Sequence, residues 1–214
     1  MRIFIVNPNT SKSITNRIQE EIEKIKRVDT EVVVLCNQKG PEAIDSEYHL
    51  AMTVPYTLDL VRKANLEQYN AIMIAAFPDP GLTAAREISN IPVFGIEEVS
   101  LHIAAMLGAK FSILTTTKQR VPSKRADVYK YGLSYNLASI RSLGQLTIAN
   151  DTNPDNTKKR IIEVGQKAIE EDGAEVLVLG CAGMAGYSNE IENKLRVPII
   201  DPTRVTFKII EALV

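Results

Sequence analysis

The stretch VLVLGCAGM, residues Val176 to Met184, points most directly to the fold. Its first four residues are all Val or Leu, which is typical of a strand buried on both faces of a parallel sheet. A glycine and Cys181 follow, so the thiol lies just past the C-terminal end of that strand. Open α/β sheets bind their ligands at this edge. Cys181 is therefore either a site thiol or a small buried residue in a tight turn, because free cysteines are among the most buried residue types.

Length and charge limit the possible functions. The chain has 214 residues and a formal net charge of -1, which suits one large α/β domain or two lobes with a shared core and predicts no nucleic-acid partner. No run of eighteen apolar residues occurs, and the opening residues MRIFIVNPN change from an apolar run to a turn without forming a cleavable signal. We therefore expect a cytoplasmic protein with no membrane partner.

The cysteines and histidines predict no metal centre. The two cysteines, Cys36 and Cys181, do not form a CxxC pair, and both are expected to be free thiols. Cys36 ends a predicted strand and is interpreted as structural. His49 and His102 lie far apart in the sequence, whereas zinc sites use three or more protein ligands. Both histidines are interpreted as helix-face residues.

The rest of the chain alternates strands and helices. Isoleucines recur every three or four residues between Lys12 and Val28, which predicts a helix capped by Thr10 or Ser11. The free N–H groups of its first turn either bind a ligand or serve only the cap. Further strands are predicted at Arg2–Val6, Glu31–Cys36, Ala71–Ala76, Pro92–Gly95, Phe111–Leu114 and Val197–Ile200. Further helices are predicted at Glu47–Ala64, from Gly81 onward, and at Glu98–Leu107, Gln119–Tyr131, Pro154–Glu171 and Thr203–Leu213.

Two segments yield no regular element. Ser134 to Asp151 is the least periodic part of the chain, and the residues around Gly183 and Gly186 are predicted as a loop.

The two halves of the chain resemble each other. IPVFGIEEVSLHI at 91–103 matches VPIIDPTRVTFKI at 197–209, AIMIAAFPDPG at 71–81 matches VLVLGCAGMAG at 176–186, and IFIVNPNT at 3–10 matches FSILTTTK at 111–118. Three matches in the same order indicate a duplication. We predict an α/β protein of two pseudo-symmetric, flavodoxin-like lobes with parallel sheets, residues 1–97 plus 205–214 and residues 98–204. The strand ends would face one inter-lobe active-site cleft, and the position matched with Cys181 is Ala76.

Several motifs resemble one known family. They are NPNTS at 7–11, GPxxI at 40–44, DPGL at 79–82, the pair Thr116-Thr117, and LGCAGMAG at 179–186. Together they are similar to the aspartate/glutamate racemase superfamily, and within it to the hydantoin and allantoin racemases, over essentially the full length. The resemblance implies a racemase that needs no cofactor, acts on a small-molecule hydantoin or related ureide, and forms a homo-oligomer, as members of the family often do.

The resemblance also implies a pair of catalytic cysteines, one a thiolate base and the other a thiol acid. The second family cysteine corresponds to Cys181. The first corresponds to Ala76, and Cys36 ends a different strand outside the motif. A cysteine of ordinary pKa about 8.5 becomes a useful base only where nearby dipoles favour its thiolate.

The remaining site residues are expected to bind the substrate. Helix N-termini and backbone N–H groups favour a thiolate and also hold an enolate oxygen. We assign this work to the turns at Phe77, Thr116–Thr117 and Ala182–Gly183, while Asn9 would hold a substrate carbonyl. Simple helix capping stays open for Asn9 and both threonines, and Asp79 is interpreted as a turn former. Three further residues complete the predicted pocket: Ile44, Pro80 and Gly81.

Ala76 allows three interpretations. The chain is a racemase in which the first cysteine has been replaced by engineering, which the family fit favours. Alternatively, it is a natural single-cysteine enzyme similar to the arylmalonate decarboxylases, or a non-catalytic binder of a ureide or small acid. The parent activity predicted from the motifs is racemisation of a 5-substituted hydantoin, with little or none of it left in this chain.

Overall fold

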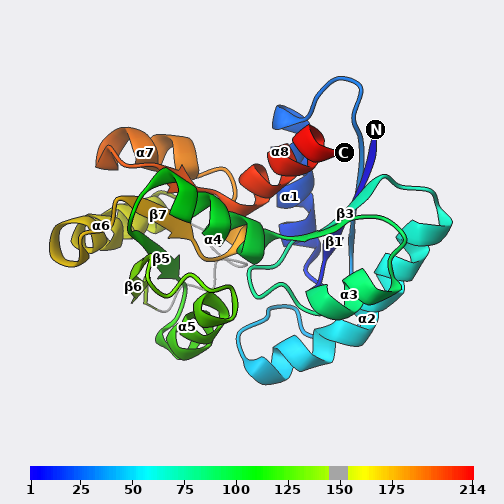
Figure 1. Cartoon of the computed structure of the whole chain (residues 1–214), viewed down its shortest axis with the longest axis horizontal. Helices are drawn as coiled ribbons and strands as arrows, with labels where there is room; N and C mark the ends of the chain where they lie inside the picture. The colour runs from blue at the N-terminus through cyan, green and yellow to red at the C-terminus, as the bar shows by residue number, and fades with distance from the viewer. Residues whose placement is uncertain (145–153) are drawn as a thin grey trace. The chain divides into compact units, whose positions relative to one another are not determined.

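The computed structural model describes residues 1–144 and 154–214, and these contain two four-stranded parallel sheets with flanking helices (Figure 1). The first sheet has the order β2-β1-β3-β4 and the second has the order β6-β5-β7-β8. The strands of the first are β1 (Arg2–Asn7), β2 (Glu31–Cys36), β3 (Ala71–Ile74) and β4 (Val93–Gly95). Those of the second are β5 (Phe111–Thr115), β6 (Leu137–Ser142), β7 (Val176–Leu179) and β8 (Ile199–Ile200).

The chain divides into two compact units. The first unit is Met1–Val99 with Thr203–Val214, and the second unit is Ser100–Pro202. Helices of the first unit are α1 (Lys12–Ile25), α2 (Glu47–Leu66), α3 (Leu82–Ile88) and α8 (Pro202–Leu213), while α4 (Ile96–Leu107) starts there and continues into the second unit. Helices of the second unit are α5 (Val121–Lys130), α6 (Pro154–Asp172) and α7 (Ser188–Leu195), with short 3-10 turns at Lys118–Arg120 and Ala182–Met184.

In the first unit the core forms on the sheet made by β1 and β3. Phe4 and Ile72 pack with Val61 of α2 and Leu82 of α3 in one buried cluster. The helix predicted from the isoleucine spacing is present as α1. Ser11 caps it, because its hydroxyl accepts a hydrogen bond from the N–H of Ile14, the third residue after it. A local period of 3.6 residues is therefore sufficient to predict this helix.

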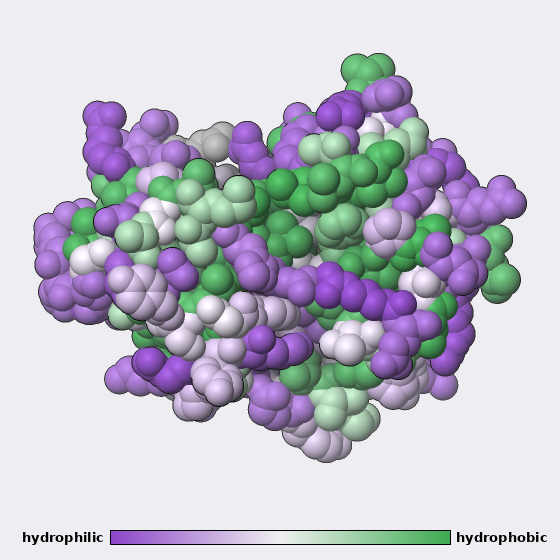
Figure 2. All heavy atoms as spheres, in the orientation of Figure 1, coloured by the Kyte–Doolittle hydropathy of each residue, from purple (hydrophilic) through white to green (hydrophobic). Residues whose placement is uncertain are grey.

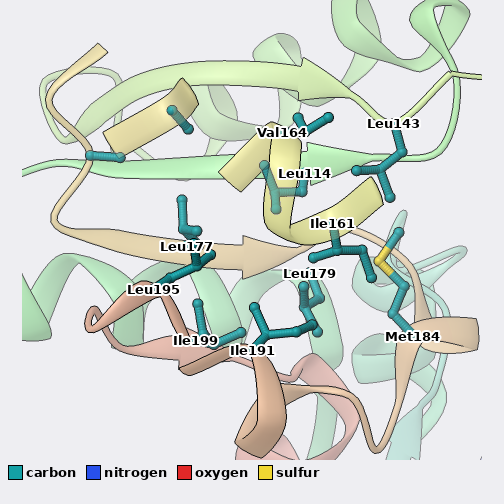
Figure 3. Packing of buried hydrophobic residues seen from close by; sticks show 12 residues of the cluster. Leu114, Leu143, Ile161, Val164, Leu177, Leu179, Met184, Ile191, Leu195 and Ile199 are labelled. Atoms are coloured by element: carbon teal, nitrogen blue, oxygen red, sulfur yellow. The ribbon is translucent and has the colours of Figure 1, made fainter. Parts of the chain in front are cut away.

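In the second unit the VLVL segment is the fully buried strand β7. Leu177 and Leu179 pack among apolar side chains of β5, α6 and α7 (Figure 3). Leu114, Ile161 and Ile191 belong to the same cluster. The interpretation of this segment as a strand covered on both faces is confirmed.

Two elements are not predicted by the sequence pattern. β6 lies within the stretch judged aperiodic, because it is an edge strand whose six residues are all only half-buried. Its residue Arg141 points to carboxylates instead of apolar neighbours, with Nε 2.5 Å from Asp172 Oδ2. The loop predicted after Cys181 contains α7, a helix of 8 residues with Ile191 and Leu195 as buried anchors. Residues 145–151 of the aperiodic stretch lie outside the described residues.

The duplication is confirmed by the topology. β1, β2, β3 and β4 occupy the same order in their sheet as β5, β6, β7 and β8 in theirs. Equivalent loop bonds support the match, since Ile72 N–H donates to Pro92 O at 2.9 Å and Leu177 N–H donates to Pro198 O at 3.0 Å. β2 and β6 are therefore also a matched pair, which the sequence comparison did not detect.

The surface is mixed. The face drawn in Figure 2 is covered mainly by hydrophilic residues, with hydrophobic patches between them. Some large apolar side chains are exposed, among them Leu66, Met106 and Leu213. Across the described ranges, every helix is too short or too polar to cross a lipid bilayer.

Candidate active site

Matched hydrogen bonds extend β3 and β7 by one residue before their turns. Ala75 N–H donates to Val6 O at 2.8 Å, and Gly180 N–H donates to Leu114 O at 2.9 Å. Each bond joins the end of the strand to its central neighbour in the sheet. The two turns therefore start from the same point of their sheets.

The residues that begin these turns are Ala76 and Cys181. Asp79 N–H donates to Ala76 O at 2.8 Å, and Met184 N–H donates to Cys181 O at 3.0 Å. Both turns are thus closed by the same bond, between the first residue and the third one after it. Ala76 is the backbone counterpart of Cys181, as the sequence match predicted, and the two differ in the group that the side chain presents.

Cys181 combines a thiol outside any disulfide with a suitable backbone setting. The residue is partly exposed. It stands immediately before the 3-10 turn Ala182–Met184, and Ala182 is buried against the core. N–H groups at the start of a helical turn favour an anion, so the turn at Ala182 and Gly183 suits a thiolate or an enolate oxygen. Cys36 is also partly exposed and free, so exposure by itself does not separate the two thiols.

On the first unit, Asp79 connects the turn after Ala76 to the start of α4. Its two carboxylate oxygens accept hydrogen bonds from Glu97 N–H at 2.9 Å and Glu98 N–H at 2.8 Å. The residue before α4 is Gly95, and a Cβ there would lie 2.3 Å from Asp79 Cγ. The Asp79 carboxylate therefore caps α4, although Asp79 is remote from this helix in the sequence. It occupies the space that a side chain at position 95 would need.

The second unit makes the same connection in the opposite direction. Asp201 occupies the position matched with Gly95, and its Oδ2 accepts a hydrogen bond from Gly186 N–H at 2.9 Å. Here the carboxylate comes from the residue before the helix and reaches back to the turn. In both halves of the chain one carboxylate thus joins the turn to the residues that begin the next helix, and it is supplied from opposite ends.

The other residues of the Ala76 turn support its shape. Phe77 and Pro80 are buried, and Asp79 and Gly81 have positive φ angles of 47° and 75°. Asp79 is one of few non-glycine residues in this left-handed region. The turn is irregular, as its two prolines predict.

The Asn7–Ser11 loop places Asn9 at the end of β1. Asn9 is 7% exposed, and its Oδ1 accepts hydrogen bonds from Asn7 Nδ2 and from Ser11 N–H, each at 2.9 Å. Ser11, not Thr10, caps α1 with its hydroxyl. Helix capping thus does not account for the Asn9 side chain, which leaves its amide nitrogen for another partner.

Two neighbouring segments hold this loop. Thr10 N–H donates to Pro41 O at 3.1 Å, which joins the loop to the GPxxI segment that contains the half-buried Ile44. Asn37 Nδ2 donates to Pro8 O at 2.6 Å. Asn37 is not among the residues predicted from the sequence, although a polar residue directly after a strand at the binding edge is a usable signal.

Thr116 and Thr117 follow β5, the strand beside β7. Thr117 precedes the 3-10 turn at Lys118, yet its side chain forms no capping hydrogen bond. Both threonines are half-buried. Capping therefore does not explain Thr117, and its hydroxyl is available as a donor at the same sheet edge as Cys181.

The structure groups the predicted residues by unit. Asn9, Ile44 and the Ala76–Gly81 turn lie on loops at the carboxyl edge of the first sheet, and Thr116, Thr117 and Cys181–Gly183 lie at that edge of the second. In the part of the chain that is described, no three His, Cys, Asp or Glu side chains gather as metal ligands.

The clearest electrostatic pair lies away from these loops. Hydrogen bonds from Arg141 lower the pKa of Asp172, and the same carboxylate together with Glu171 raises the pKa of the Arg141 guanidinium. This pair fastens the edge strand β6 to the end of α6.

Comparison with known proteins agrees with the motifs and the fold. A family model described as Asp/Glu/Hydantoin racemase matches residues 3–210. A hydantoin racemase of Pseudomonas sp. (strain NS671) is 35% identical, with 100% of this chain and 86% of the relative covered. The structure of an allantoin racemase from Klebsiella pneumoniae has a TM-score of 0.95 at 31% identity and covers 100% of this chain and 87% of its own.

A more distant structure shares only the fold. A liganded mutant of arylmalonate decarboxylase has a TM-score of 0.76 at 14% identity, covering 99% of this chain and 92% of its own.

Proposed function

The chain belongs to the Asp/Glu/Hydantoin racemase family, and from this premise we propose that its framework is that of a racemase for 5-substituted hydantoins or allantoin. The observation that carries the proposal is the equivalence of the turns at Ala76 and Cys181, which have the same closing hydrogen bond. Racemisation requires proton transfer at two faces of one carbon, and two equivalent turns suit that requirement.

The first step is assigned to Cys181. Its thiolate removes the proton from the substrate carbon next to the carbonyl, and the electron pair of the broken C–H bond moves into the carbonyl to give an enolate. N–H groups of the turn at Ala182–Gly183 and the hydroxyls of Thr116 and Thr117 stabilise the enolate oxygen. Such donors act most strongly where water is excluded.

The second step is assigned to position 76. A thiol there donates its proton to the opposite face of the carbon, which completes the inversion and leaves a thiolate for the next turnover. The methyl group of Ala76 has no exchangeable proton. The chain with Ala76 is therefore expected to exchange the substrate proton with solvent from one face only, with retention of configuration.

The test is to restore the thiol. Ala76→Cys is expected to start racemisation of an enantiopure 5-substituted hydantoin or of allantoin, measured as loss of optical rotation. Ala76→Ser, which is similar in size, is the matched control and is expected to stay inactive because a hydroxyl is a far weaker acid than a thiol. Absence of racemisation in the Ala76→Cys protein, folded as judged by its circular dichroism, would refute the proposal.

A second function is favoured by the single thiol. With one cysteine at Cys181 and a methyl group at Ala76, the chain also suits protonation of an enediolate from one face after loss of carbon dioxide. Release of carbon dioxide from an arylmalonate by the unmodified chain would favour this decarboxylase. Binding of a ureide without either reaction would instead favour a non-catalytic binder.

We further propose that the protein assembles with copies of itself. The resemblance to a family whose members are often oligomers supports this proposal, because single exposed apolar side chains such as Leu66, Met106 and Leu213 also occur on monomers. Sedimentation equilibrium of the intact chain tests it, and a monomer at micromolar concentration would contradict it.

A further inference from the structure

We propose that Asn7 is a positioning residue that fixes the amide of Asn9 so that only the Asn9 NH2 group faces a ligand. This deepens the proposed function, on which the identity of the ligand rests. The carbon skeleton of an asparagine side chain does not by itself decide whether its oxygen or its nitrogen faces a ligand. In this loop the surrounding donors and acceptors decide it.

The amide of Asn7 has one allowed orientation. Its Nδ2 lies 3.3 Å from the backbone oxygen of Ser11, which only accepts hydrogen bonds. It also lies 2.9 Å from Thr15 Oγ1, whose own proton is donated to Ser11 O at 2.8 Å. Both neighbours are acceptors, so the atom of Asn7 that faces them is the nitrogen. Its two protons go to Thr15 Oγ1 and Asn9 Oδ1, each at 2.9 Å, and the longer contact to Ser11 O shares one of them.

The amide of Asn9 follows from that of Asn7. Its Oδ1 accepts from Asn7 Nδ2 and from the backbone N–H of Ser11, each at 2.9 Å. A reversed Asn9 amide would direct its own N–H groups at these two donors, and buried donors without an acceptor are costly. The oxygen is thus held inside the loop, and the nitrogen is turned away from it.

The free end of Asn9 is a hydrogen-bond donor. Asn9 is 7% exposed, and its Nδ2 makes no hydrogen bond to the residues that the structure describes. Two N–H groups match the lone pairs of a carbonyl or carboxylate oxygen and mismatch a ring N–H. Asn9 therefore selects a ring carbonyl of a hydantoin or ureide, and Asn7 makes this selection possible.

The ligand test uses the unmodified chain and three variants. Calorimetry measures binding of an enantiopure 5-substituted hydantoin and of its two monothio analogues, because a thiocarbonyl sulfur is the weaker acceptor. The unmodified chain is expected to prefer the oxygen compound over one of the analogues. Asn7→Asp is expected to weaken hydantoin binding about tenfold, the effect of one lost hydrogen bond, and to abolish the preference for oxygen. Thr15→Val is expected to have a smaller effect in the same direction.

Ser13→Ala is the matched control, since Ser13 contacts Ser11 Oγ at 3.0 Å in the same turn. It is expected to bind as the unmodified chain does. A folded Asn7→Asp protein that keeps the oxygen preference would overturn the proposal, because loss of general stability alone would not erase that preference.

A second measurement needs no ligand. In the ¹⁵N spectrum of the intact chain, the NH2 protons of Asn7 are expected to exchange slowly with solvent and those of Asn9 quickly. The opposite order would overturn the assigned orientation. If these rates agree but no hydantoin or allantoin binds, the proposed function fails while the orientation of the amides stands.

Discussion

The turns at Ala76 and Cys181 share one closing hydrogen bond but differ in their first side chain, and in backbone at Asp79, whose φ of 47° has no counterpart at Met184. Their closing hydrogen bonds differ by 0.2 Å, at 2.8 and 3.0 Å. The carboxylate that steadies the turn comes from Asp79 within the turn in the first unit and from Asp201 before the helix in the second. The two turns thus have the same closing hydrogen bond and differ in the reactive group and in the source of the supporting carboxylate. The closing bond does not depend on the thiol, because it also forms at Ala76.

The largest expected effect comes from moving the thiol between the two turns. In the unmodified chain, Cys181 is expected to exchange the α-proton of one hydantoin enantiomer in deuterated water. The double variant Ala76→Cys with Cys181→Ala is expected to exchange the proton of the other enantiomer, because the base then acts from the opposite face. Proton NMR follows the loss of the α-proton signal.

Cys36→Ala is the control for that exchange, and it is expected to leave the enantiomer preference unchanged. Exchange of the same enantiomer by both thiol arrangements would contradict the equivalence of the two turns in function.

Next in size is the effect of a side chain at Gly95. Gly95→Ala places a Cβ 2.3 Å from Asp79 Cγ, and it is expected to lower the free energy of unfolding by about 3 kcal/mol through overlap and displacement of the carboxylate. Denaturant titration measures the change. The same substitution combined with Asp79→Gly should add little further loss, because the overlapping group is absent. Equal losses in both backgrounds would show that the two residues do not compete for space.

A smaller loss of folding free energy is expected from removing the charge of Asp79 or of Asp201, the carboxylates that support the two turns. Asp79→Asn leaves one oxygen for the two N–H groups of Glu97 and Glu98, and is expected to lower the free energy of unfolding by about 2 kcal/mol. Asp201→Asn keeps an oxygen for Gly186 and is expected to lower it by about 1 kcal/mol. Thermal unfolding of both variants ranks them. A larger loss for Asp201→Asn would reverse the assigned importance of the two carboxylates.

The smallest effect concerns acid stability of the second unit. Arg141 lowers the pKa of Asp172 below its ordinary value of 3.8, so the charged pair stabilises the fold above that pH. This stability is lost as the pH falls from 3.8 through the lower pKa of the folded state. Asp172→Asn is expected to reduce the drop in melting temperature between pH 5 and pH 2, although partial exposure of the pair keeps the effect small. An unchanged drop would mean that other carboxylates dominate acid unfolding.

Much of the fold followed from local patterns. The isoleucines of α1 and the VLVL run of β7 were sufficient, because a buried helix face and a buried strand leave their own periods in the sequence. β6 and α7 were not predicted, because neither has a strong apolar period of its own. β6 is a half-buried edge strand that contains Arg141, and α7 is short, with two buried anchors and no side-chain cap. Their stability comes from neighbours that are distant in sequence.

The sequence by itself determined the duplication, the place of Cys181 after a buried strand, and the match with Ala76, because each is carried by consecutive residues. Only the tertiary structure decided which polar groups meet. Asp79 reaches the start of α4 across 18 positions of sequence, Asn37 holds Pro8 from the neighbouring strand, and Asn7 orients the amide of Asn9. Hydrogen bonds depend on distance and direction in space, and residue types along the chain do not specify either.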